Sequence, residues 1–250
     1  DKLMIRRRKV DILDQLPEKQ RIVLPIDMDA KGRTEYIKAE DDFLGWIGET
    51  QPSKLRGASR AEAIVKFGHL KRLAGRRKIP AVMEWIDNFL VSEEKLIVFA
   101  IHKKVIRRLA KRYWATCVKV DGSVTGKQRK LAIQKFLTHR DCRLLIGNVK
   151  AAGVGWSAKG ISNIAFIEFP WTPGDVTQAE GRGHGIERGK KGEPTRVWFL
   201  TARNTIEEKL VKLLQKNAKV ANLAIDGEGK GDPLDIFDKL TASLKRRKAQ

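Results

Sequence analysis

The chain has 250 residues, of which 42% are hydrophobic, so it can hold one domain with extensions, or two small domains, around a proper core. No apolar run approaches the ~20 residues that a membrane helix needs, and the N-terminal text DKLMIRRRKV lacks a signal peptide's apolar stretch, which argues against a membrane or secreted protein. Fifty-one Lys and Arg against thirty Asp and Glu give a net charge of +21, which favours a polyanionic partner, above all nucleic acid, over a merely soluble cationic surface.

Residues 1–90 predict a strand-like run followed by a basic helical stretch. A strand-like run covers residues 21–28, and the mixed-polarity stretch 29–53 offers Tyr36, Phe43 and Trp46 as packing residues. The positive charge then clusters, because residues 54–78 hold nine Lys or Arg and one acid, Glu62. This clustering favours the nucleic-acid interpretation of the net charge.

Two helices are predicted within residues 54–90. The first covers residues 54–77, and its expected apolar side consists of Ile64, Phe67, Leu70 and Ala74. The second starts near Pro80, which suits the first turn of a helix, and its apolar residues recur at helical spacing: Val82, Met83, Ile86, Phe89 and Leu90.

From residue 95 the pattern alternates between strand and helix. Strands are predicted at residues 96–101, 117–120, 144–146, 164–168 and 197–200. Helices are predicted at residues 103–113, around residues 132–137 and after Asn204, which we expect to cap a helix with Glu207 three residues later. Strands separated by helices predict an α/β fold with a parallel sheet covered on both faces.

No metal site or disulfide is predicted. Cys117 and Cys142 fall in or beside predicted strands, where reduced core thiols are the favoured interpretation. The four histidines show no ligand spacing with them.

A set of ordered motifs lies between residues 143 and 188. Ala152-Gly153-Val154-Gly155 follows one apolar run, Trp171-Thr172-Pro173 follows the next, and Gln178-Ala179-Glu180-Gly181-Arg182-Gly183-His184 comes last. This order resembles motifs V and VI of superfamily 2 helicases, and in detail it is similar to the Swi/Snf group of DNA translocases. The spacing from Glu168 to Gly174 most resembles the branch of that group that contains the annealing helicases.

The resemblance implies an architecture. Residues 1–90 would be the connector from a first lobe plus a helical insertion, residues 91–225 a second RecA-like helicase lobe, and residues 226–250 a linker with a basic tail. The expected partners are double-stranded DNA and the first RecA-like lobe of the same protein, with no membrane, and the expected location is the cytoplasm or nucleoid, or the nucleus.

The resemblance also implies a nucleotide site for ATP, with Mg²⁺ held mainly by the first lobe. Gly153, Gly155, Gln178 and Arg182 are the expected nucleotide-binding residues, and Gln178, Arg182 and Arg188 the expected catalytic ones. The alternative for Arg182 is an arginine on the solvated face of a helix, without a functional role. The family's second arginine is usually taken as the arginine finger, and this chain has Gly185 at its position. Three explanations remain: the arginine was deliberately substituted, the enzyme is naturally weakened, or Arg188 reaches in from one turn later.

Expected DNA contacts come from loops after the strands. By resemblance they are His102, Lys103, Ser123, Arg129, Asn148 and Lys150. A simple turn into a helix is an equally good interpretation of Ser123. Contacts to phosphate carry no sequence information, so no sequence preference is expected.

The text from Gly122 to Gln128 is not a phosphate-binding loop, because only three residues separate its glycines and neither Ser nor Thr follows the lysine. We therefore expect the lobe to be inactive alone, as one part of an ATP-dependent DNA translocase. The alternative function is a non-catalytic DNA-binding or remodelling scaffold that retains the fold.

Overall fold

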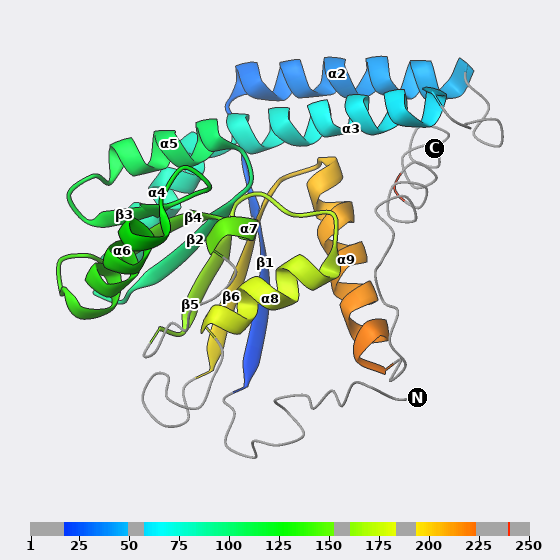
Figure 1. Cartoon of the computed structure of the whole chain (residues 1–250). Coiled ribbons are helices and arrows are strands. Elements are labelled where there is room, and N and C mark those ends of the chain that lie inside the picture. The colour runs from blue at the N-terminus through cyan, green and yellow to red at the C-terminus, as the bar shows by residue number, and fades with distance from the viewer. Residues whose placement is uncertain (1–17, 50–57, 153–160, 184–193, 224–239, 241–250) are drawn as a thin grey trace.

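A computed structural model of the chain describes residues 18–49, 58–152, 161–183, 194–223 and 240. Its centre is a six-stranded sheet in the order β1-β6-β5-β2-β4-β3, in which every pairing is parallel (Figure 1). The strands are β1 (Lys19–Ile26), β2 (Leu96–Ala100), β3 (Cys117–Val120), β4 (Leu144–Asn148), β5 (Asn163–Phe166) and β6 (Thr195–Ala202). The predicted parallel α/β sheet flanked by helices is confirmed.

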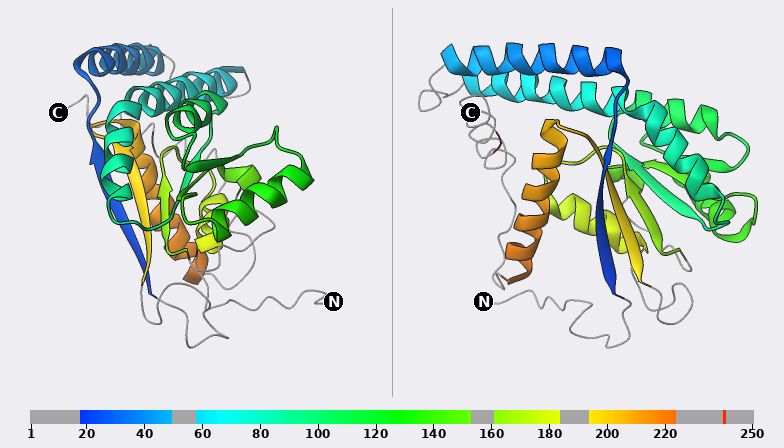
Figure 2. Two further views of the ribbon diagram at one scale, coloured as in Figure 1. Left: turned by 90° about the vertical axis from the view of Figure 1, so that its left-hand side faces the viewer. Right: turned by 180° about the vertical axis from the view of Figure 1, so that it is seen from behind.

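Helices cover both faces of this sheet and one of its ends (Figure 2). They are α2 (Ala30–Glu49), α3 (Ala58–Arg77), α4 (Ile79–Leu90), α5 (Lys103–Arg112), α6 (Gly126–Thr138), α7 (Val149–Ala152), α8 (Pro173–Gly183) and α9 (Ile206–Leu223). Helices α4 and α5 pack on one face, and α6 to α9 pack on the other. Helices α2 and α3 run side by side across the carboxyl end of the strands.

The alternation of side chains along the strands explains the two layers. In β2, Ile97 and Phe99 join the core beneath α6 to α9, whereas Leu96, Val98 and Ala100 join the core beneath α4 and α5. All five side chains are buried, because successive residues of a strand point to opposite faces and both faces are covered. This is why the strand reads as a continuous apolar run in the sequence.

The helical insertion differs from its prediction in two places. Residues 30–49, for which the sequence predicted no element, form helix α2, because Tyr36 and Phe43 lie two turns apart and are both buried against α3 and the core. Ile64, predicted on the apolar side of α3, is exposed. The buried residues of α3 are instead Ala63, Phe67, Leu70, Leu73 and Ala74.

The start of α9 is also not as predicted. Asn204 adopts a left-handed conformation with φ of 56° and precedes the helix by one further residue. Thr205 takes the capping role, since its Oγ1 accepts the backbone N–H of Glu207 at 3.2 Å. Glu207 does not fold back onto the helix start but points into the core. The prediction that Asn204 and Glu207 form a capping box is therefore wrong.

A fully buried ion pair joins α4 to α9. Lys78 Nζ lies 2.5 Å from Glu207 Oε2 and donates to the backbone oxygen of Leu200 at 2.6 Å, and the same carboxylate accepts the N–H of Ala202 at 2.7 Å. Burial lowers the pKa of Lys78 and raises that of Glu207, and the attraction between them opposes both shifts. These contacts fix α4 and α9 to the end of β6.

We expect Glu207→Gln to lower the free energy of unfolding by about 3–5 kcal/mol, because it leaves the Lys78 ammonium buried without a counter-charge. Urea unfolding of the chain measures this. Asp27→Asn removes the partner of Arg203 from an exposed pair and should cost less than about 1 kcal/mol. A Lys78→Met/Glu207→Leu double variant should recover most of the loss, and equal losses for Glu207→Gln and Asp27→Asn would contradict the assignment.

Candidate functional site

Helix α8 carries two of the side chains predicted to face a nucleotide. Gln178 is exposed, and one turn later the half-buried Arg182 donates from Nε to the Gln178 backbone oxygen at 3.3 Å. The pKa of Arg182 is lowered, first by partial burial and then by the positive charge of Arg129 on α6. The guanidinium group of Arg129 is thus near enough for its charge to act on Arg182, and two such groups suit a multiply charged anion such as a triphosphate.

A buried carboxylate holds α8 against the sheet. Glu180 is fully buried, accepts two hydrogen bonds of 2.7 Å from the Arg21 guanidinium and lies 3.0 Å from Lys19 Nζ. Burial alone would raise the pKa of Glu180, but the hydrogen bond from Arg21 and the charges of both cations outweigh it and leave the pKa lowered. Because a bidentate pair fixes direction as well as distance, it sets the rotation of α8 and hence the side on which Gln178 and Arg182 emerge.

The contacts of Glu180 also locate α8 along the sheet. Helix α8 begins shortly after the carboxyl end of β5. Its partners Lys19 and Arg21, however, lie in the first half of β1, next to the start of β6, because Lys19 pairs with Thr195. The second half of α8 thus lies towards the amino ends of the strands. Arg182 belongs to this second half.

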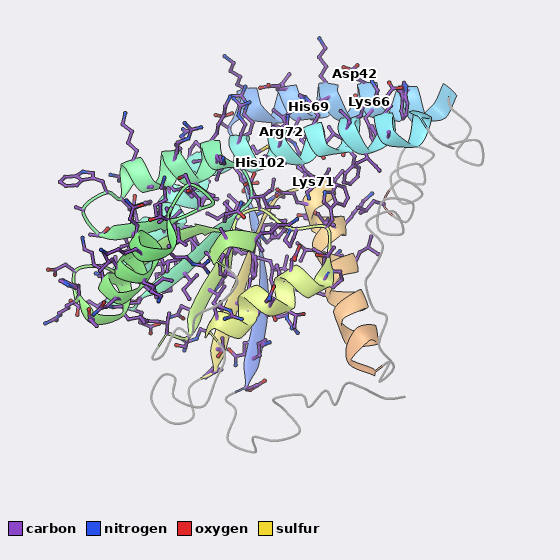
Figure 3. All side chains as sticks on the ribbon, in the orientation of Figure 1. Asp42, Lys66, His69, Lys71, Arg72 and His102 are labelled. Atoms are coloured by element: carbon purple, nitrogen blue, oxygen red, sulfur yellow. The ribbon has the colours of Figure 1, made fainter. Side chains whose placement is uncertain are left out.

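At the carboxyl edge, His102 is held by a buried acid at the end of β5. Glu168 accepts the backbone N–H groups of Ile101 and His102 at 2.8 Å each, and its Oε1 lies 2.5 Å from His102 Nδ1. Burial acts to raise the pKa of Glu168, yet the His102 ring and the two backbone amides outweigh it and lower the pKa. In Figure 3, His102 lies close to α3, where α5 begins.

Arg129, also predicted as a DNA contact, is half-buried in the first turn of α6, and the four remaining predicted contacts fall into two groups. The side chains of Asn148 and Ser123 are engaged locally: Asn148 Nδ2 donates to the Ile101 oxygen at 2.8 Å and its Oδ1 accepts the N–H of Lys150 at 3.0 Å, while Ser123 donates from its hydroxyl to Asp121. Lys103 and Lys150 are exposed at the starts of α5 and α7. The exposed lysines are thus positioned by neighbours that hold the loops in shape.

Gly122 to Gln128 forms a turn into α6. Thr125 caps the helix with a reciprocal hydrogen-bonded box to Gln128. Four other residues singled out in the sequence lie outside the described residues: Gly153, Gly155, Gly185 and Arg188.

The sequence did not single out Lys71 or assign a role to Glu180. Lys71 is a buried residue of α3. Its Nζ donates to the backbone oxygen of Phe169 at 2.8 Å and lies 4.1 Å from the centroid of the Trp171 ring. Burial lowers its pKa to about 8. A lysine inside an otherwise apolar helical stripe, and an acid beside Val176 and Ala179 on α8, are the signals that could have found them.

Some site types are absent from the described residues. Among them, no three His, Cys, Asp or Glu side chains gather as metal ligands would, and Cys117 and Cys142 are free thiols. Within the same ranges, no helix has the length and apolar character that crossing a bilayer requires.

Comparison with known sequences places these features in a family. Residues 78–187 match the family described as the helicase conserved C-terminal domain. The human protein named DNA annealing helicase and endonuclease ZRANB3 is 27% identical over 236 residues, covering 90% of this chain and 20% of its own length. The Bos taurus protein named SWI/SNF-related matrix-associated actin-dependent regulator of chromatin subfamily A-like protein 1 is 30% identical over 224 residues, covering 87% of this chain and 22% of its own length. The chain thus spans about a fifth of the length of such relatives.

Solved structures share the fold. The crystal structure of the C-terminal part of the Fun30 ATPase domain superposes with a TM-score of 0.67 at 15% identity and covers 93% of this chain and 99% of that one. The Sulfolobus solfataricus SWI2/SNF2 ATPase core in complex with dsDNA gives a TM-score of 0.66 at 19% identity, with 96% and 52% coverage.

The acid sensitivity of the fold should depend on Glu180. Its folded pKa lies below the ordinary value of 4.5, so the folded state binds its proton less readily than the unfolded state does. The resulting stability is present above pH of about 4.5 and is lost as pH falls through the lower folded pKa. We expect Glu180→Gln to flatten the fall of the unfolding free energy below that pH, measured by urea unfolding between about pH 3 and 7. An unchanged acid slope in the variant would contradict the role given to Glu180.

Proposed function

Because this chain is the C-terminal, RecA-like lobe of a Swi/Snf-type helicase, we propose that it is the second half of an ATP-driven motor on double-stranded DNA. It would close on a first RecA-like lobe with ATP between them and reopen after hydrolysis. The observation that carries the proposal is helix α8, which presents Gln178 and Arg182 at the surface from a rotation fixed by the Glu180 ion pairs.

Positively charged side chains of this lobe would contact the phosphates of the nucleotide. Partial burial and, after it, the charge of Arg129 lower the pKa of Arg182, and an incoming triphosphate would offset the repulsion between the two guanidinium groups. Phosphoryl transfer depends on such positioned charge around the β- and γ-phosphates. In this proposal the first lobe binds most of the nucleotide and its Mg²⁺, and this lobe supplies arginine side chains from across the cleft.

The DNA would bind at the carboxyl edge of the sheet. Lys103 and Lys150 are exposed at the starts of α5 and α7, where their side chains could contact phosphate. Glu168 fixes His102, and Asn148 caps α7, so these loops are held before DNA arrives. Figure 3 shows that Lys66, His69 and Arg72 on α3 extend this basic edge. A protein with this role would act in the nucleoid or the nucleus.

A non-catalytic scaffold is the second candidate, and Gly185 favours it. Glycine has no side chain to donate to a phosphate, and an arginine finger contributes roughly 10³ to 10⁵ in turnover in well-studied motors. In the motor proposal, Arg182 and Arg188 supply the side-chain donors of this motif.

The isolated chain should bind duplex DNA with a steep dependence on salt and little dependence on sequence. If about three phosphates are neutralised, the affinity should fall about 40-fold between about 50 and 200 mM salt. Fluorescence anisotropy with two labelled duplexes of unrelated sequence measures both properties. Binding that is insensitive to salt would contradict the electrostatic interface.

In a preparation that holds both lobes, Arg182→Ala should lower DNA-stimulated ATP hydrolysis by about 10²-fold or more, because a donor to the transferred phosphate is lost. Lys38→Ala, which removes one exposed cation from α2, is the matched control and should leave turnover unchanged. Gly185→Arg should raise turnover, and the isolated lobe should show none. The scaffold function is indicated if turnover is absent in the two-lobe protein and stays absent on Gly185→Arg.

A further inference from the structure

Helix α5 has an outer face that consists of basic residues. Val105, Ile106 and Leu109 point into the core, and every other residue except Ala110 is an exposed lysine or arginine. These cations form three adjacent pairs at four-residue spacing: Lys103 and Lys104, Arg107 and Arg108, Lys111 and Arg112. Each pair rises about 6 Å above the last, so the row is about 12 Å long.

This face is not neutralised by neighbouring acids. The one ion pair between α5 and another described residue joins Arg112 Nη2 to Asp87 Oδ2 at 3.1 Å, and α5 itself contains no acid. Like charges four residues apart destabilise a helix, and two lysines in the first turn oppose the helix dipole. Helix stability therefore does not explain the pattern, whereas an anionic ligand along the face would remove the repulsion.

An exposed tryptophan lies where this basic face ends. Trp114 is 79% exposed and makes no ring contact with a described residue. Its backbone is held in a turn, since Thr116 N–H donates to the Tyr113 oxygen at 3.0 Å and the buried Tyr113 donates from its hydroxyl to Met83 at 2.8 Å. The backbone that carries this exposed ring is thus held in place, two residues after Arg112 in the chain.

We propose that the outer face of α5 and Trp114 form a binding site for single-stranded nucleic acid, separate from the duplex-binding loops. A row of cations follows a sugar-phosphate backbone, and an exposed aromatic ring stacks on a base, which is the usual combination in single-strand sites. In a duplex the faces of the bases are stacked on each other, so Trp114 would find no face to contact. The ring therefore selects an unpaired strand.

The position of α5 suits this role. The helix starts at His102, at the carboxyl edge where the proposed duplex contacts lie, and runs back along its face of the sheet towards the start of β3 at Cys117 (Figure 1). A strand that leaves a duplex at the carboxyl edge would meet Lys104 first, then Arg107, Arg108 and Lys111, and reach Trp114 last. The site would hold one separated strand of a DNA junction while the duplex occupies the loops.

The test compares labelled oligothymidine with a labelled duplex, using the full chain at one salt concentration. Trp114→Ala should weaken oligothymidine binding about 5- to 100-fold, the range expected when one stacking ring is lost, and should change duplex affinity less than about twofold. Trp114→Phe keeps an aromatic ring and should restore most of the oligothymidine affinity. Lys104→Ala/Arg108→Ala should lower the salt dependence of oligothymidine binding, whereas the distant Lys38→Ala should not.

Trp114 is exposed, so each variant should keep the thermal unfolding curve of the unaltered chain. Photocrosslinking to an iodouracil-substituted oligothymidine gives a second measurement that needs no variant, and the adduct should map to Trp114. The proposal is overturned if Trp114→Ala leaves oligothymidine binding unchanged, if it weakens duplex binding equally, or if the adduct maps only elsewhere. Loss of duplex binding or ATP hydrolysis in other variants would concern the motor proposal and not this site.

Discussion

The requirement that buried charges be paired governs the carboxyl end of this sheet. Lys78 and Glu207 neutralise each other inside the core, and Glu168 accepts hydrogen bonds from two backbone amides and lies against His102 Nδ1. Each group would be costly to bury alone, so each pair admits few arrangements of the elements that carry it. The pairs join α4 to α9 and β5 to the start of α5. The framework that presents the loops is therefore fixed by charge as well as by apolar packing.

The buried ammonium of Lys71 also needs polar or aromatic partners inside the protein. Its ammonium reaches from α3 to the backbone oxygen of Phe169 and to the face of Trp171, so the helical insertion is tied to the segment that follows β5. Next to it, Gly75 allows α3 to approach closely, because a Cβ there would lie 2.5 Å from Glu168 Oε1. The basic insertion is thus part of the same rigid edge as the predicted DNA loops and not a separate appendage.

The two proposed sites are separated on this framework. The carboxyl edge presents lysines next to helix starts, and α8 carries Arg182 away from that edge, towards the amino ends of the strands. Glu180 links α8 to β1, the strand that the family resemblance assigns to the connector from the first lobe. In the motor proposal, Arg21 and Glu180 would therefore carry a shift of the connector to α8.

Long apolar runs and ordered motifs let the sequence determine the parallel sheet, helices α5, α6 and α9, and the family. Strand β3 has the predicted limits because Cys117 to Val120 is bounded by turn residues on both sides. Local pattern could not find α2, whose buried residues are sparse, nor show that Glu207 faces the core rather than its own helix end. It could not assign Glu180 a role or place Arg129 beside Arg182. These facts depend on contacts between residues far apart in the chain, such as Arg21 and Glu180, which are 159 positions apart, and only the folded chain brings such residues together.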